Sequence, residues 1–180
     1  MKTIVHSVGL NRLIYFALPM LIAVLLVPPV KRIAWRFGIF AQENNRTVHH
    51  GKIPRIGGVA VYIAFIAGCM ALLRFDRAFI SMLIGGTVVF IGGLLDDILN
   101  LPPKIKLLFQ ACGALIVMIY GNLDLNVIKL PFGLTIPPSF FSYVITFFWL
   151  IGITNAINLL DGLDGLSSGF SIIVLLSICL

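Results

Sequence analysis

The sequence predicts an all-α integral membrane protein, a polytopic helical bundle in which residues 1–180 form a single transmembrane domain. Composition is the first reason: 59% of the 180 residues are hydrophobic, 11% are charged, and the mean hydropathy is +1.07. Water-soluble domains carry far more charge than this. The second reason is that the apolar residues form long runs without a polar face, a pattern typical of membrane-spanning helices. A soluble globular protein is therefore not expected.

Six apolar runs follow one another along the chain, and we expect the first five to span the membrane. They cover residues 13–30, 56–73, 78–95, 105–120, 140–157 and 166–180. The first run is too long for the apolar part of a signal peptide, and no small-residue cleavage site follows it. The sixth run has fifteen residues, fewer than the ~20 that a span requires. We therefore predict five full spans plus a truncated sixth, and interpret the chain as the N-terminal part of a larger fold.

The distribution of Lys and Arg predicts how the chain is oriented. Six of the 13 basic residues lie in residues 31–55, where Glu43 is the single acid. The positive-inside rule places this segment on the cytoplasmic side and accounts for the net charge of +6 without a nucleic-acid partner. Residues 96–104 follow two spans later, and residues 158–165 follow two spans after that. All three segments are therefore predicted to lie on the cytoplasmic face.

Four polar side chains recur every three residues at the end of the fifth run: Asn155, Asn158, Asp161 and Asp164. Residues three apart are neighbours on a helix, so adjacent members can form one polar stripe. Ionisable groups at the edge of a bilayer are costly and usually functional. A plain polar loop explains the acids but does not require the two Asn residues inside the apolar run. The pattern therefore favours a functional site.

A second acidic pair, Asp96 and Asp97, follows the third run. Adjacent carboxylates repel each other unless a cation or a proton intervenes. Mg²⁺ suits such a pair, because it binds one or two carboxylates and fills its other positions with water and phosphate oxygens. A solvated turn also explains the pair, but two acidic clusters on one face are a stronger signal. Lys106 either snorkels to the interface or holds a phosphate.

The segment before the second run combines basic residues, two His residues and a Pro/Gly frame. It reads Arg46-Thr-Val-His49-His50-Gly-Lys52-Ile-Pro54-Arg55-Ile-Gly57-Gly58. Arg and Lys suit an anionic ligand such as phosphate, although a positive-inside loop explains the charge equally well. Zinc is not expected, because no Cys or further His accompanies the two His residues.

Together the three segments resemble the polyprenyl-phosphate N-acetylhexosamine-1-phosphate transferases. That family includes the bacterial undecaprenyl-phosphate GlcNAc-1-phosphate transferases and the phospho-N-acetylmuramoyl-pentapeptide transferases. The matching stretches are Arg46…His49…Pro54…Gly57-Gly58, then Gly93-Leu-Leu-Asp96-Asp97 with Lys106 and Gln110, and then Asn155-Ala-Ile-Asn158-Leu-Leu-Asp161-Gly-Leu-Asp164-Gly-Leu. The last stretch is the most specific, and the resemblance extends from the first run to the end of the chain.

The resemblance implies transfer of a sugar-1-phosphate, with GlcNAc-1-phosphate favoured, from a UDP-amino sugar to undecaprenyl phosphate, with release of UMP. It implies an enzyme that depends on Mg²⁺, with Mn²⁺ as an alternative, and that performs the first membrane step of cell-envelope polysaccharide synthesis. The implied catalytic residues are Asp96, Asp97, Asp161 and Asp164, of which Asp97 and Asp161 bind the metal, and the implied substrate-binding residues are Arg46, His49, Lys106, Asn155 and Asn158. The implied location is the bacterial plasma membrane, multi-pass, with a cytoplasmic active face. Assembly into a homo-oligomer is left open.

The chain departs from the family's pattern in three places. Thr47 stands where the family commonly has Lys, and Gln42-Glu43-Asn44-Asn45 replaces the usual Asp-x-Pro-Asn. A later Gly-Asp-Ala-Gly-Ser-like motif, with another metal-site Asp, and a His-rich loop would both fall beyond Leu180. We therefore expect the 180-residue chain to be inactive by itself.

Three other interpretations stay open on the sequence alone. One is phospho-MurNAc-pentapeptide transfer in peptidoglycan synthesis, within the same family. Another is a cation transporter, which predicts acids in the middle of spans, whereas these acids lie at span ends. The third is a non-catalytic membrane remnant that inserts and assembles with other chains.

The predicted orientation can be tested by cysteine labelling. Cysteine substituted for Arg46, Asp96 or Asp161 is expected to react with a membrane-impermeant maleimide only from the cytoplasmic side, because two spans separate each consecutive pair. The measurement compares labelling of right-side-out and inverted membrane vesicles. Labelling of any one position from outside would contradict the shared face.

Overall fold

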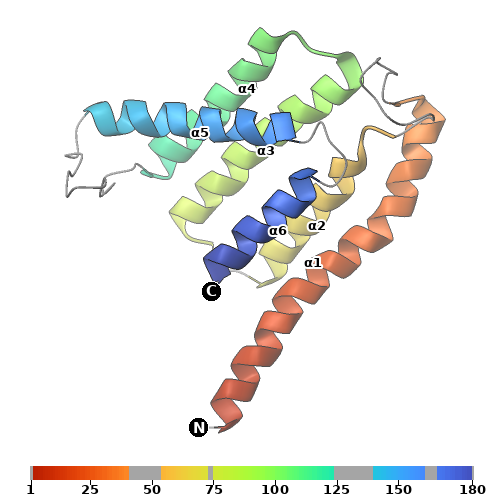
Figure 1. The fold of residues 1–180 in the computed structure, drawn as a ribbon, viewed down its shortest axis with the longest axis vertical. Coiled ribbons are helices and arrows are strands. Elements are labelled where there is room, and N and C mark those ends of the chain that lie inside the picture. The colour runs from red at the N-terminus through yellow and green to blue at the C-terminus, as the bar shows by residue number, and fades with distance from the viewer. Residues whose placement is uncertain (1, 41–53, 73–74, 124–139, 161–165, 180) are drawn as a thin grey trace.

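The computed structural model describes residues 2–40, 54–72, 75–123, 140–160 and 166–179, which form a bundle of helices (Figure 1). The helices are α1 (Lys2–Phe37), α2 (Gly57–Leu72), α3 (Arg77–Leu99), α4 (Pro103–Leu115), α5 (Phe140–Leu160) and α6 (Leu166–Cys179). A π-helical turn, Ile116–Tyr120, continues α4. Within these ranges the extended pairing is limited to an isolated bridge between Phe40 and Pro54. The all-α prediction is confirmed for this part of the chain.

Four segments of the described helices are long and apolar enough to cross a membrane. They are Phe16–Phe37, Arg77–Leu99, Pro103–Tyr120 and Phe141–Leu160. Two shorter apolar helices, Gly57–Ala71 and Leu166–Ser177, lie within the second and sixth predicted runs. Large apolar side chains are exposed along the helices, as expected where lipid takes the place of water. The chain is thus a multi-pass membrane protein, while the count of five full spans plus a truncated sixth stays a prediction.

Small residues bring α1 and α2 together. Ala60 and Ala64 of α2 are buried, and a Cβ added to Gly68 would lie 2.6 Å from Pro19 Cγ on α1. This small-xxx-small stripe, four residues apart in sequence, is therefore the face of α2 that meets α1. A buried cluster closes the end of this pair and consists of Val30, Ala34, Ile56 and Ala60.

The helices α3 and α4 form a hairpin in which the two backbones touch. A Cβ on Gly85 would lie 2.7 Å from Gly113 O, and a Cβ on Gly113 would lie 2.7 Å from Gly85 O. Nearer the turn, a Cβ on Gly92 would lie 2.5 Å from Phe109 Cβ. Since no side chain fits at these positions, glycine is what allows α3 and α4 to approach so closely.

Polar contacts fasten the end of this hairpin that is remote from its turn. Asp76 caps α3, because its Oδ1 accepts a hydrogen bond from the Phe79 N–H at 2.7 Å. Arg77 Nε donates to Tyr120 O at 2.7 Å, and the guanidinium lies 5.3 Å from the centroid of the Tyr120 ring. The start of α3 is thereby tied to the end of the π-helical turn.

Two of the remaining helices, α2 and α5, pack on this hairpin. Tyr62 of α2 stacks on Phe90 of α3, with ring centroids 3.8 Å apart, and its hydroxyl forms a hydrogen bond with Thr87 Oγ1. The helix α5 crosses α4 at a steep angle and packs against it (Figure 1). The hairpin is therefore the element that α2 and α5 both contact.

The glycine contact predicts a sharp difference between neighbouring positions. Gly85→Ala is expected to destabilise the bundle by about 1–3 kcal/mol, because the new methyl group meets backbone atoms that do not yield. Gly86→Ala is the matched control, since a Cβ at Gly86 meets no atom within 4 Å. Reversible unfolding in mixed micelles by sodium dodecyl sulfate, followed by circular dichroism, measures both. Equal stability of the two variants would show that α3 and α4 can move apart without a loss in the free energy of unfolding.

Candidate functional site

Residues 96–102 form the turn between α3 and α4 and are called the acidic turn below. Asn100 adopts the left-handed conformation (φ 50°, ψ 65°) and donates its N–H to Asp96 O at 2.8 Å, which ends α3. Pro102 and Pro103 follow, and proline at the first helical position starts α4. The sequence Asn-Leu-Pro-Pro therefore reverses the chain directly after Asp96 and Asp97.

Both carboxylate oxygens of Asp96 are engaged. Oδ1 accepts a hydrogen bond from the Leu101 N–H at 3.0 Å, and Oδ2 lies 2.6 Å from Lys106 Nζ. The Asp96 side chain is only 20% exposed, so this ion pair is shielded more than one on an open surface. Asp96 thus fixes the shape of the acidic turn and places Lys106 of α4 beside the end of α3.

Asp97 is more exposed than Asp96. Its side chain is 40% exposed, and its Oδ1 lies 3.9 Å from Arg55 Nε, beyond hydrogen-bond distance. The Arg55 guanidinium is instead bound by neutral oxygens, since Nη1 donates to Asn100 Oδ1 at 2.8 Å and approaches Asp97 O at 3.5 Å. The two acids therefore differ: Asp96 is committed to the turn, and Asp97 presents a more accessible carboxylate.

The main chain carries Arg55 to this place. The Arg55 N–H donates to Ile39 O at 3.4 Å, and the neighbouring Pro54 pairs with Phe40. Gly38 allows this pairing, because its φ of +69° turns the chain after α1 in a conformation that side chains disfavour. The end of α1 thus positions Arg55 against a helix end more than forty residues later.

The electrostatics of this arrangement are unusual for a helix end. The C-terminus of a helix carries partial negative charge, so two acids in the last turn of α3 are unfavourable there. Lys106 and Arg55 approach from α4 and from the segment before α2, and each lies beside one acid. Two carboxylates and two cations thus lie close together at the end of α3.

A polar bridge links this region to α5. Gln110 Nε2 donates to Asn155 Oδ1 at 3.2 Å, and Asn155 Nδ2 donates to Gln110 Oε1 at 2.8 Å. Asn155 Nδ2 also donates to Ile151 O at 3.0 Å within α5. Gln110 lies four residues after Lys106, hence on the same face of α4. The predicted site residue Asn155 is therefore connected to the acidic turn through α4.

The structure brings together only part of the predicted site. Asp96, Asp97 and Lys106 meet at the acidic turn, Asn155 joins through Gln110, and Asn158 lies exposed on α5. Four other predicted site residues, Arg46, His49, Asp161 and Asp164, lie outside the described residues. Among those described, no three His, Cys, Asp or Glu side chains gather as a metal site.

Three residues that contribute most to this geometry were not among the predicted site residues. Arg55 and Gln110 belong to the matching motifs. Neither the charge of Arg55 nor the amide of Gln110 indicates in the sequence which residue it contacts. Asn100 has a local signal, since Asn directly before Leu-Pro-Pro is typical of a left-handed helix end. A polar residue four positions after Lys106 was the available signal for Gln110.

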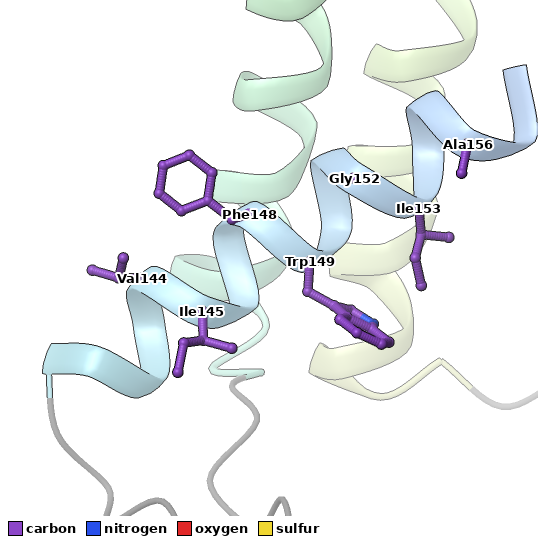
Figure 2. Close-up of a pocket in the computed structure, with 7 residues that line it drawn as sticks. All are labelled: Val144, Ile145, Phe148, Trp149, Gly152, Ile153 and Ala156. Atoms are coloured by element: carbon purple, nitrogen blue, oxygen red, sulfur yellow. The ribbon is translucent and has the colours of Figure 1, made fainter. Parts of the chain in front are cut away.

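Two apolar grooves lie on the outer surface of the helices. A groove of about 520 Å³ follows α5, and Figure 2 shows Ile145, Trp149 and Ile153 projecting in a row from one side of that helix. A second groove of about 420 Å³ lies among α3, α4 and α5, with Gln110 and Thr154 in its wall. Neither lining contains a titratable side chain, so these two grooves offer no charged group for chemistry.

These features define a multi-pass membrane protein with a charged site at the end of α3. At that site two cations face the acidic turn. Comparison with known proteins gives the family. The sequence model described as Glycosyl transferase family 4 matches residues 79–180, more than half of the chain. The chain belongs to this family.

Curated relatives carry the same assignment. The chain is 37% identical over 166 residues to a probable undecaprenyl-phosphate N-acetylglucosaminyl 1-phosphate transferase of Bacillus subtilis strain 168, covering 91% of the chain and 46% of the relative. It is 34% identical over 146 residues to the undecaprenyl-phosphate alpha-N-acetylglucosaminyl 1-phosphate transferase of Escherichia coli K12, covering 78% and 39%. It is 30% identical over 164 residues to the decaprenyl-phosphate N-acetylglucosaminephosphotransferase of Mycobacterium tuberculosis H37Rv, covering 84% and 40%. The chain spans less than half the length of these relatives, and no solved structure matches it.

The carboxamide bridge between α4 and α5 gives a prediction about stability. Gln110→Ala and Asn155→Ala are each expected to destabilise the bundle, and their coupling in a double-mutant cycle is expected to be about 1 kcal/mol. The reason is that each single variant leaves one carboxamide without its partner. Unfolding in sodium dodecyl sulfate measures the four proteins of the cycle. Strictly additive effects would show that the two amides do not interact in the membrane.

Proposed function

We propose that the protein containing this chain transfers GlcNAc-1-phosphate from a UDP-amino sugar to undecaprenyl phosphate and releases UMP. The proposal extends to this chain what the names of its relatives say of those proteins. The single observation in the structure that supports it is the pairing of two carboxylates with Lys106 and Arg55 at one helix end. A reaction between two phosphate-bearing substrates requires both a cation site and fixed positive charge.

In the proposed reaction, an oxygen of the lipid phosphate attacks the phosphorus atom attached to the sugar, and the bond from that phosphorus to the UMP oxygen breaks. The lipid phosphate is largely ionised at neutral pH, so the reaction does not require a strong base. The main difficulty is repulsion between two anions, which positive charge and positioning must overcome. Lys106 is suited to this task, because Asp96 holds its ammonium group at the acidic turn.

The residues at the acidic turn fit a divalent cation only in part. Asp97 has the more exposed carboxylate, with 40% of its side chain exposed against 20% for Asp96. We therefore assign Asp97 as the described residue that holds the ion, Mg²⁺ or alternatively Mn²⁺, with Asp161 as its predicted second ligand. A bound Mg²⁺ would offset the charge of the diphosphate while keeping several water ligands. Asp96 then acts on the ion only through the shape of the turn.

The groups that recognise the substrates are proposed on the same basis. Asn155 is placed by Gln110 and by its own helix, which suits a carboxamide that orients a polar substrate. Arg46, His49, Asn158, Asp161 and Asp164 complete the proposed set through the resemblance of their motifs. The protein is proposed to lie in the plasma membrane of a bacterium. Its active face is proposed to be the cytoplasmic one, because nucleotide sugars are available on that side.

The proposed function can be tested in a hybrid that joins residues 1–180 to the remaining part of the Bacillus subtilis relative. In nanodiscs with undecaprenyl phosphate, UDP-GlcNAc and Mg²⁺, the hybrid is expected to release UMP, measured by a coupled nucleotide assay. Asp97→Asn is expected to lower the rate at limiting Mg²⁺ by at least about a hundredfold, in keeping with the weight of electrostatic groups in catalysis.

The control for this experiment is Asp76→Asn, which removes an acid from the cap of α3 at the other end of the hairpin. It is expected to leave the rate within a factor of about three, because the cap retains a side chain of comparable capping strength. UMP release by Asp97→Asn at the parent rate would exclude Asp97 from the cation site. Complete absence of UMP release by a folded hybrid would contradict the proposed function.

A further inference from the structure

Arg55 is the cation of the acidic turn that the motifs leave without a role. Its main chain is fixed on both sides, by the hydrogen bond to Ile39 O and by the buried side chain of Ile56 that follows it. The side chain then extends to the end of α3, where it meets Asp97 and Asn100. Several specific contacts therefore hold the Arg55 guanidinium at the site proposed above.

The contacts of Arg55 are weaker than a guanidinium can make. Arginine normally binds a carboxylate through two parallel hydrogen bonds of about 2.8 Å. Here Nε stays 3.9 Å from Asp97 Oδ1, and the short contact at 2.8 Å is to the neutral amide oxygen of Asn100. The pair Lys106–Asp96, at 2.6 Å, shows that a close ion pair does form at the adjacent carboxylate. Arg55 is therefore held near Asp97 without being bound tightly to it.

The charges around Arg55 indicate how its side chain would respond to a divalent cation. Among the described residues of the acidic turn and its partners, the formal charges of Asp96, Asp97, Lys106 and Arg55 sum to zero. A divalent cation at Asp97 would add two positive charges and repel the neighbouring guanidinium. The side chain of Arg55, 30% exposed, has room to turn from Asp97 toward an incoming anion. A phosphate group restores the balance and matches the planar fork of arginine.

Resting on the function proposed above, we propose that Arg55 is a phosphate-binding residue of this site, held in reserve by Asn100 and Asp97 and released when a divalent cation reaches Asp97. Its ligand is a phosphate oxygen, either of the nucleotide diphosphate or of the lipid phosphate. Arg55 and the divalent cation then compete for Asp97 but cooperate in binding the anion. A purely structural arginine would have neither property.

The proposal predicts opposite effects on anion and cation binding when the Arg55 guanidinium is removed, whereas a purely structural role does not. Removing the guanidinium removes a phosphate ligand, so the anion binds more weakly. It also removes the positive neighbour of Asp97, so the divalent cation binds as well as before or more tightly. Loss of a merely structural contact would weaken both, because both ligands need the same folded turn.

Isothermal titration calorimetry of the 180-residue chain in phosphatidylcholine nanodiscs tests the proposal. The probes are MgCl2 alone, uridine diphosphate with Mg²⁺, and farnesyl phosphate with Mg²⁺. Arg55→Gln is expected to weaken binding of one phosphate probe by about tenfold or more, as for loss of a charged hydrogen bond, with the Mg²⁺ affinity kept or raised. Arg55→Lys, which keeps the charge without the fork, is expected to lose less. The probe that weakens identifies which substrate Arg55 binds.

Two further variants guard against misfolding. Arg36→Gln removes a positive charge from the exposed last turn of α1 and is expected to bind every probe as the parent chain does. Asn100→Gly keeps the left-handed conformation but removes the oxygen that holds Arg55, and is expected to bind the phosphate probe at least as tightly as the parent. Weaker phosphate binding by Asn100→Gly would indicate a structural role and overturn the proposal.

The remaining outcomes are also decisive. Equal binding of both phosphate probes by Arg55→Gln and the parent chain would overturn the role of Arg55 and leave the proposed function intact. Joint loss of Mg²⁺ and phosphate binding in Arg55→Gln and Arg55→Lys would likewise assign Arg55 to the fold alone. Failure of the folded parent chain to bind any probe would overturn the role of Arg55 in this chain, whereas the proposed function is decided separately by UMP release from the hybrid.

Discussion

Two adjacent carboxylates at the negative end of a membrane helix are the constraint on which the rest of this structure depends. Such acids repel each other and the helix carbonyls, and the low dielectric of the surroundings makes the repulsion stronger. The fold answers with a cation from each side, Lys106 from α4 and Arg55 from the segment before α2. Both cations require close packing of their own elements, which the small residues of α1, α2, α3 and α4 supply.

The two acids, Asp96 and Asp97, also have different environments. Asp96 satisfies its oxygens within the turn and so resembles a structural residue that happens to carry charge. Asp97 keeps a more exposed carboxylate, and its Oδ1 lies 3.9 Å from Arg55 Nε. Identical side chains in adjacent positions thus obtain different environments from the turn and from the two cations. Differences of this kind are how one site assigns separate tasks to residues of the same type.

Much of the fold was readable in the sequence, because uninterrupted apolar runs and the small-residue spacing Ala60, Ala64 and Gly68 have direct physical meanings. The same is true of Asp96, Asp97 and Lys106, which topology and local spacing bring together. The contact of Arg55 with Asn100 was not readable, because no periodicity relates residues 45 positions apart. Nor was the pairing of Gln110 with Asn155, since the angle at which α5 crosses α4 depends on packing that the sequence does not state.

The carboxamide pair has a consequence for how the protein is made. While α4 has entered the bilayer and α5 has not, the Gln110 amide lacks its partner, a loss of about 1 kcal/mol on the scale of polar pairs between membrane helices. Arrival of α5 removes that cost for both helices at once. Integration of α5 is thereby coupled to that of α4, so the two helices are favoured to leave the insertion machinery as a unit.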